Sequence, residues 1–150
     1  AYGVVWNETT QRLYAIGGQS LQIYKLKDWE TAAPSLELEK TVQTPQGGLH
    51  DMSYVNSNTL CIGGRRAYLY DIGANRFTEM MLFSASTAIK SINYNDETGE
   101  LWYTDSTNPE GSQSWSTQTI RYSTDKNAST ETRTIKVPDL DVYKVRVMNW

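Results

Sequence analysis

Four residues that can bind charged or polar groups begin four copies of one short sequence pattern. The first residues of the four copies are Tyr2, His50, Lys90 and Lys144. Two are lysines and one is a histidine, so together they could hold an anion through ammonium and imidazole groups. Arg146 lies two positions after Lys144, and therefore on the same side of an alternating strand. The pattern predicts a cationic binding site, provided that the fold brings the four copies together.

The spacing of the copies indicates a repeat architecture. Successive copies begin at residues 2, 50, 90 and 144, so they are 48, 40 and 54 residues apart. One four-stranded blade of a β-propeller takes roughly 40 to 50 residues. In a propeller the inner strand of each blade lines the central channel, and its first residue lies at the channel mouth. The sequence therefore predicts an all-β propeller fold in which the first residues converge at one face.

Each copy is followed by the turns and strands that a blade requires. Asn, Asp and Gly separate the first strand from the second, as in tight hairpins. Third strands are expected at 21–24, 67–70 and 119–122, and alternating outer strands at 36–41, 76–81 and 131–136. We expect one partial propeller domain over residues 1–150, with blades at about 1–45, 48–85 and 88–138 and the inner strand of a further blade at about 142–149.

Three blades are fewer than the usual closed ring of about four to eight. Blades without a neighbour leave a sheet face and a strand edge uncovered. Two arrangements would cover them: the chain is part of a larger propeller, or it pairs with a second copy as a three-plus-three dimer. In either case we expect the remainder of the ring as a protein partner.

The chain also resembles a known family. Five segments carry the resemblance, and together they extend over essentially the whole chain: Tyr2–Asn7, Arg12–Gly18, Gly48–Ser53, Ile89–Ile92 and Val142–Arg146. They resemble the C-terminal half of a family of bacterial, exported β-propeller proteins of unknown function. The family pattern has His where this chain has Tyr2. The resemblance implies a periplasmic or cell-surface location, and it implies no activity.

Loops between the second and third strands are expected to open on the same face as the channel mouth. They contribute Arg65 and Arg66 in the second blade and Trp115 in a Ser-rich loop over 106–116. Arginine binds a carboxylate through two hydrogen bonds, and an exposed tryptophan stacks on a sugar ring. We therefore expect an anionic carbohydrate, such as a uronic or sialic acid unit, as the ligand. The candidate ligand-binding residues are Tyr2, His50, Arg65, Arg66, Lys90, Trp115, Lys144 and Arg146.

Two other interpretations of the function of these residues stay open. A lyase or hydrolase acting on acidic sugars could use His50, Lys90 or Tyr2 as its base. However, Asp51 follows His50 directly, and adjacent strand residues point to opposite faces, so Asp51 is not expected to orient the imidazole. A protein-interaction scaffold with a water-filled channel is the third reading, because a fold alone does not define a function. The residues favour binding over catalysis.

Composition excludes several other classes of protein. A net charge of −3 and a pI near 5.1 do not suit a general nucleic-acid binder, which needs a broad basic surface. No apolar run reaches the ~18 residues of a membrane span. Cys61 is the single cysteine and is expected to be buried in a strand, and one His with one Cys cannot form a zinc site. No metal or cofactor is expected.

Overall fold

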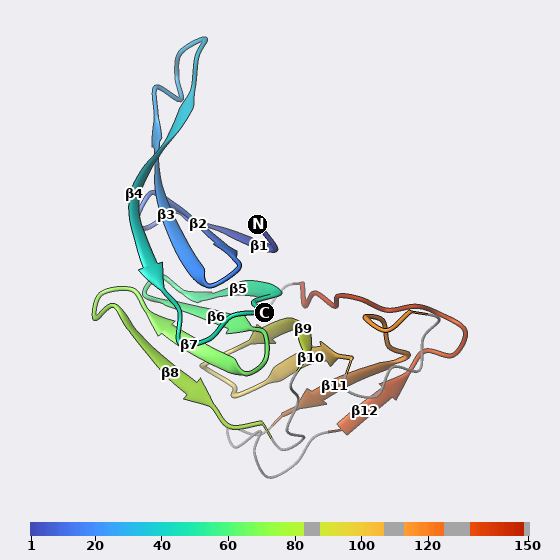
Figure 1. Cartoon of the computed structure of the whole chain (residues 1–150). Helices are drawn as coiled ribbons and strands as arrows, with labels where there is room; N and C mark the ends of the chain where they lie inside the picture. The colour runs from blue at the N-terminus through green and yellow to red at the C-terminus, as the bar shows by residue number, and fades with distance from the viewer. Residues whose placement is uncertain (83–87, 107–112, 125–132, 149–150) are drawn as a thin grey trace.

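The fold consists of three four-stranded antiparallel sheets that fan out around a common centre (Figure 1). The computed structural model describes residues 1–82, 88–106, 113–124 and 133–148. The first sheet contains β1 (Gly3–Asn7), β2 (Arg12–Gly17), β3 (Ser20–Lys27) and β4 (Ser35–Gln43). The second contains β5 (Asp51–Asn56), β6 (Thr59–Gly63), β7 (Ala67–Asp71) and β8 (Arg76–Met80). The third contains β9 (Ile89–Tyr94), β10 (Leu101–Asp105), β11 (Thr119–Ser123) and β12 (Arg133–Lys136).

Strand order within each sheet follows the sequence, as in a propeller blade. The inner strands β1, β5 and β9 lie at the centre, while the outer strands β4, β8 and β12 lie at the periphery (Figure 1). The expected propeller blades are confirmed as three antiparallel sheets. Each predicted third strand lies inside an observed one, as does the outer strand at 36–41, while the outer strand predicted at 76–81 ends at Met80 in the structure. Residues 131–132 of the last predicted strand lie outside the described residues.

Two hydrophobic cores fill the joints between neighbouring blades. Strand alternation sends Val5 of β1 and Met52 of β5 into the first joint, where they meet Leu60 and Ile62 of β6. The second joint contains Cys61, Ile89, Ile92, Leu101 and Tyr103. At Gly3 the two inner strands approach so closely that a Cβ atom would lie 2.6 Å from the backbone nitrogen of Met52. Burial between the blades therefore fixes the inner strands side by side.

The segment that follows the third blade was expected to be the inner strand of a further blade, at about 142–149. Residues 143–148 are not paired as a strand within the described residues, and a single bridge between Thr117 and Val142 precedes them. No second strand pairs with this segment in the part of the chain that the structure describes. Side chains of the third blade hold it instead, and Asn149, at the end of the predicted strand, lies outside the described residues.

The β3–β4 hairpin extends beyond the body of the first blade (Figure 1). One of its faces is charged, with Glu39 bound to Arg12 at 2.6 Å and Glu37 bound to Lys27 at 2.7 Å. The other face carries Leu26 opposite Leu36, and its side chains are exposed. The hairpin thus has a polar side and an apolar side, as strand alternation dictates.

Candidate cationic site at the channel mouth

The first residues of the repeated pattern meet at the start of the inner strands. Lys90 Nζ lies 3.0 Å from His50 Nε2, and the ring of Tyr2 contacts the His50 ring edge-on at a centroid distance of 5.7 Å. Tyr2 directly precedes β1, His50 directly precedes β5, and Lys90 is the second residue of β9. The inter-blade cores align these strands, so the structure brings together side chains that are 40 to 88 residues apart.

Lys144 closes this group from the C-terminal side. Its ammonium donates hydrogen bonds to the backbone carbonyl oxygens of Tyr2 at 2.8 Å and His50 at 2.9 Å. It also contacts Asp51 Oδ1 at 3.1 Å. The chain therefore returns to its own beginning at the channel mouth, and one ammonium group joins the first blade, the second blade and the C-terminal segment.

Asp51 is the residue that sequence reasoning missed. Its side chain is fully buried, and its carboxylate accepts hydrogen bonds from Lys144, from both terminal nitrogens of Arg146 and from the backbone N–H of Ile92. The distance from Arg146 Nη1 to Asp51 Oδ2 is 2.9 Å. The carboxylate contacts these groups and not the His50 ring, as strand alternation indicates. Asp51 is therefore the counter-ion of the C-terminal cations.

Three buried polar residues of the third blade dock the segment after Val142. Ser91 Oγ accepts from the backbone N–H of Val145 at 3.0 Å, and Asn93 Nδ2 donates to the Val145 carbonyl at 3.0 Å. Thr104 Oγ1 donates to the carbonyl of Tyr143 at 2.7 Å. Ser91 and Asn93 alternate with apolar Ile92 along β9, so polar side chains occupy the face that follows the blade. That alternation was the sequence signal for a docked neighbour.

The His50 and Lys90 pair carries less positive charge than its residue types suggest. Burial, followed by the charges of Lys90 and Lys144, lowers the pKa of His50 below its ordinary value. Burial also lowers the pKa of Lys90. At neutral pH a neutral imidazole therefore accepts a hydrogen bond from the Lys90 ammonium through Nε2, which leaves the proton on Nδ1. That Nδ1 atom is buried and has no hydrogen-bond partner among the described residues.

The charges at the channel mouth do not balance. Three cations, Lys90, Lys144 and Arg146, lie at the channel mouth. Lys144 and Arg146 share the carboxylate of Asp51, whereas Lys90 contacts His50. Lys90 forms no ion pair within the described residues, and 43% of the Arg146 side chain is accessible to solvent. The site therefore has an excess of positive charge on a chain whose net charge is negative. Such an excess favours an incoming anion.

The three loop residues that the sequence proposed for this site do not all lie at the channel mouth. Trp115 contacts Tyr143 edge-on at 5.4 Å, and the Lys144 ammonium lies 5.6 Å from the centre of the same tyrosine ring. Trp115 therefore borders the site through Tyr143, while residues 107–112 of its loop lie outside the described residues. Arg65 is exposed and lies beside Gly48, two residues before His50.

Arg66 does not join the group. Its guanidinium forms an ion pair with Glu79 of the outer strand β8 at 2.7 Å, and both side chains are partly exposed. Strands β7 and β8 pair in a register that places Tyr68 opposite Glu79, so Glu79 lies close to the start of β7, where Arg66 is. The pairing of the outer hairpin thus directs Arg66 along the sheet.

The described residues contain no group of three His, Cys, Asp or Glu side chains that could hold a metal ion. Over the same residues, no helix is long and apolar enough to cross a membrane. Lys90, His50, Lys144 and Arg146 offer charge recognition and hydrogen bonding at the channel mouth, and the aromatic rings of Tyr2 and Tyr143 border them.

Comparisons with known proteins agree with the fold. No family model and no curated protein sequence matches the chain. Among solved structures, the chain is similar to one described as "Crystal Structure of Mitotic Checkpoint Complex", with a TM-score of 0.59, 14% identity and coverage of 95% of this chain and 42% of that chain. It also matches "Kluyveromyces lactis Hsv2 complete loop 6CD", with a TM-score of 0.39, 11% identity and coverage of 97% and 52%.

The sheets and the first of these similarities define the protein as a partial β-propeller. The chain spans less than half of the chain in the checkpoint-complex structure.

Proposed function

We propose that the channel mouth binds an anionic ligand, namely the carboxylate of an acidic sugar. The observation that carries the proposal is the excess of cations at the channel mouth, where the Lys90 ammonium contacts the His50 imidazole and has no ion-pair partner within the described residues. A ligand carboxylate would supply the missing counter-charge to Lys90. It could also reach the exposed part of Arg146.

Aromatic rings next to these cations support a sugar as the carrier of the carboxylate. Tyr2 is 57% exposed, and Trp115 is 46% exposed. Exposed rings with a polar edge stack on the apolar face of a pyranose while their hydroxyl or indole group stays in water. The periplasmic or cell-surface location belongs to this proposal and rests only on the resemblance described above.

The test is a titration of the protein with glucuronate, with glucose as the uncharged control, followed by calorimetry or NMR. We expect saturable binding of glucuronate alone, weakened in Lys90→Met, which removes the charge but keeps most of the apolar stem. Lys40→Met, at an exposed lysine on β4, should leave binding unchanged. Equal affinity of the Lys90→Met protein, or equal binding of glucose, would contradict the proposal.

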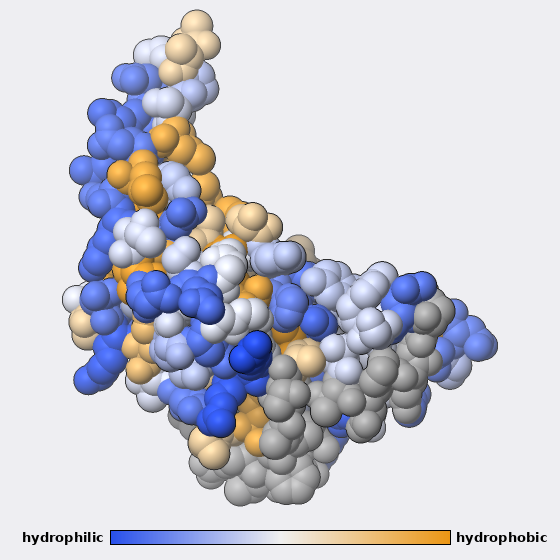
Figure 2. Space-filling model, in the orientation of Figure 1, coloured by the Kyte–Doolittle hydropathy of each residue, from blue (hydrophilic) through white to orange (hydrophobic). Residues whose placement is uncertain are grey.

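A separate observation favours a protein-interaction role for the first blade. The face of this blade that points away from the second blade is largely apolar, with Gln22 and Thr41 among its polar members. Strand register places the following side chains on it: Val4, Trp6, Leu13, Ala15, Tyr24, Leu26, Leu36 and Leu38. Figure 2 shows apolar side chains along the extended hairpin, and five members of this set are at least 39% exposed.

The repeat indicates what covers this face. The corresponding faces of the second and third blades are buried against the preceding blade, through Met52 and Leu60 in one case and Ile92 and Leu101 in the other. We therefore propose that a further blade covers the first one, supplied by the remainder of a larger propeller or by a second copy of the chain.

Light scattering of the purified chain tests this second role. A dimeric mass that becomes monomeric in Val4→Lys identifies a second copy as the partner. A monomer that aggregates with rising concentration, and aggregates less in Val4→Lys, identifies the remainder of a larger ring. A monomer that stays soluble and binds no apolar dye at this face would refute the proposal.

A further inference from the structure

The other end of the inner strands carries a pocket that the cationic site does not use. It has a volume of about 340 Å³ and lies between the second and third blades. Its walls are the ends of β5 and β9 and the turn that follows β9. The lining residues are Tyr54, Val55, Asn56, Tyr94, Asn95, Asp96 and Glu97. Inner strands begin at the channel mouth and end here, so the pocket and the cationic site lie at opposite ends.

Local sequence features hold the pocket walls in place. Asn56 Nδ2 donates to Asp96 Oδ2 at 2.6 Å, which ties the second blade to the third. Asn95 Oδ1 accepts from the backbone N–H groups of Glu97 and Thr98, which fixes the turn after β9. The pairing of β5 with β6 shifts register between Tyr54 and Asn56, so Val55 is an extra residue at this edge. Such bulges redirect the neighbouring side chains.

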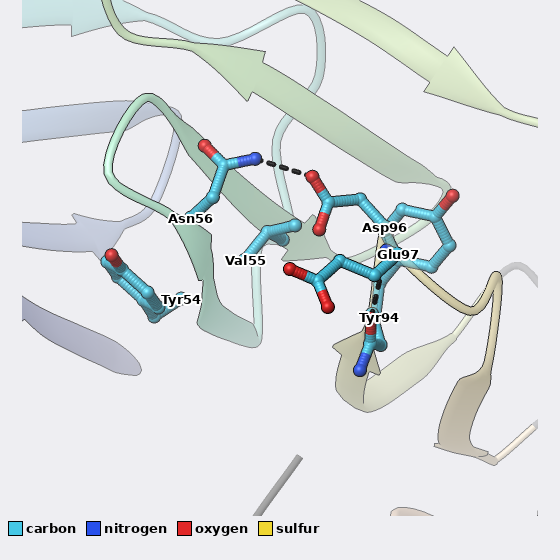
Figure 3. Close-up of a pocket in the computed structure, with 7 residues that line it drawn as sticks. Tyr54, Val55, Asn56, Tyr94, Asp96 and Glu97 are labelled. Carbon is cyan, nitrogen blue, oxygen red and sulfur yellow. Dashed lines mark hydrogen bonds between the residues drawn. The ribbon is translucent and has the colours of Figure 1, made fainter.

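The pocket combines aromatic rings with unbalanced negative charge. The rings of Tyr54 and Tyr94 lie on opposite sides of the carboxylates of Asp96 and Glu97 (Figure 3). No basic residue lines the pocket, and neither carboxylate forms an ion pair within the described residues. Tyr54 is 46% exposed although it is a large ring with an apolar face. The joint between the first two blades lacks this combination, because neutral Ser57 and Asn58 stand in the turn that corresponds to that of Asp96 and Glu97. Buried Asn7 donates there to the carbonyl of Ser57 at 2.9 Å.

From this combination we infer that the pocket binds an organic cation, specifically the arginine or lysine side chain of a protein partner. A guanidinium or ammonium group would pair with Glu97, whose carboxylate has no partner among the described residues, while the Tyr54 ring covers its alkyl stem or its charge. The volume of the pocket admits one such side chain. Asp96 keeps its hydrogen bond with Asn56 and adds a second negative charge.

A titration with N-acetyl-arginine amide tests the inference, and N-acetyl-citrulline amide is the control because it has the same shape without the charge. The readout is the shift of backbone amide NMR signals in the ¹⁵N-labelled chain. We expect saturable shifts at residues 54–56 and 94–97 with the arginine compound only. Equal shifts with citrulline, no shifts at these residues, or shifts confined to the channel mouth would overturn the inference.

Matched variants assign the contributions of charge and ring. Glu97→Gln should weaken binding about two- to fivefold, as expected for one exposed ion pair. Glu8→Gln changes the corresponding turn of the first blade and should have no effect. Tyr54→Leu should weaken binding by a similar factor while Tyr54→Phe retains it, because the ring face attracts the cation. Unchanged affinity in both Glu97→Gln and Tyr54→Leu would also overturn the inference, provided that their spectra show a folded chain.

Discussion

Replacing Asp51 by Asn should destabilise the protein by releasing the C-terminal segment from the first two blades. The substitution keeps the size of the side chain and can keep the hydrogen bond from the Ile92 N–H, but it removes the charge that faces Lys144 and Arg146. Loss of one partner of a buried ion pair costs about 3–5 kcal/mol. The Lys144 and Arg146 side chains are 25% and 43% exposed, so water compensates them in part, and we expect about 2–3 kcal/mol.

Urea unfolding measures this loss. The free energy of unfolding falls by about 2 kcal/mol per molar urea, so the unfolding midpoint should fall by about 1–1.5 M. Asp28→Asn provides the control, because it changes the net charge equally at an exposed residue of the β3–β4 hairpin. Native-state hydrogen exchange should also show faster exchange at the Val145 amide, which is held by Ser91.

A double-mutant cycle with Arg146→Met separates the ion pair from other effects of each substitution. We expect a coupling energy of about 1–2 kcal/mol between positions 51 and 146, since side chains that share a hydrogen bond rarely contribute additively. A stability of Asp51→Asn within about 0.5 kcal/mol of the parent protein, or a coupling near zero, would refute the assignment of Asp51 as the counter-ion.

Three other substitutions or treatments follow from the same structure. Burial lowers the pKa of His50 in the folded protein, so the unfolded chain binds the proton at a higher pH than the folded one does. The stabilisation from this residue is therefore full above about pH 6.5, the pKa of an unfolded histidine, and is lost as the pH falls through the lower pKa of the folded state. Urea unfolding at pH 7.5 and pH 5 should therefore show a smaller difference in His50→Gln, and an equal difference would contradict this. Gly64→Ala should cost about 1–3 kcal/mol by overpacking, because its Cβ would lie 2.7 Å from the Gly48 carbonyl oxygen, whereas Gly17→Ala has room and should be nearly neutral in the same assay. Burial, followed by the charge of Asp51, raises the pKa of the Cys61 thiol, so a thiol reagent should modify it only as fast as the chain unfolds; rapid modification of the native protein would show that the second core is open.

The repeat was the part of the fold that sequence could predict. Along Gly3–Asn7 burial alternates, and Val5 enters the core between the first two blades. Polar turns gave the strand ends, and Gly99, with a backbone φ of 77°, closes the hairpin predicted at its position. The inner strand of a further blade, predicted at about 142–149, stays a prediction, because a strand requires a neighbour and the described residues hold this segment through side chains.

The details of the site depended on contacts that a repeat does not encode. The period placed His50 and Lys90 at one mouth, but it did not show that Asp51 would bind cations 93 and 95 residues away. That contact joins the second blade to the segment that follows the third blade, so no local sequence pattern indicates it. Arg66 could have been placed from the sequence, because a β7–β8 hairpin brings Glu79 to the start of β7. The acidic pocket depends on a register shift in β5 that composition does not reveal.

The two proposed binding sites can be tested independently of each other, because the length of the inner strands separates them. A strand of six residues such as β9 spans about 20 Å, whereas charges in solution at physiological ionic strength are screened over about 8 Å. Lys90 at the start of β9 and Glu97 after its end therefore do not compensate each other. The small net charge of the chain conceals a basic end and an acidic end of the same strands. Glucuronate should consequently shift amide signals at one end, and the arginine compound should shift those at the other.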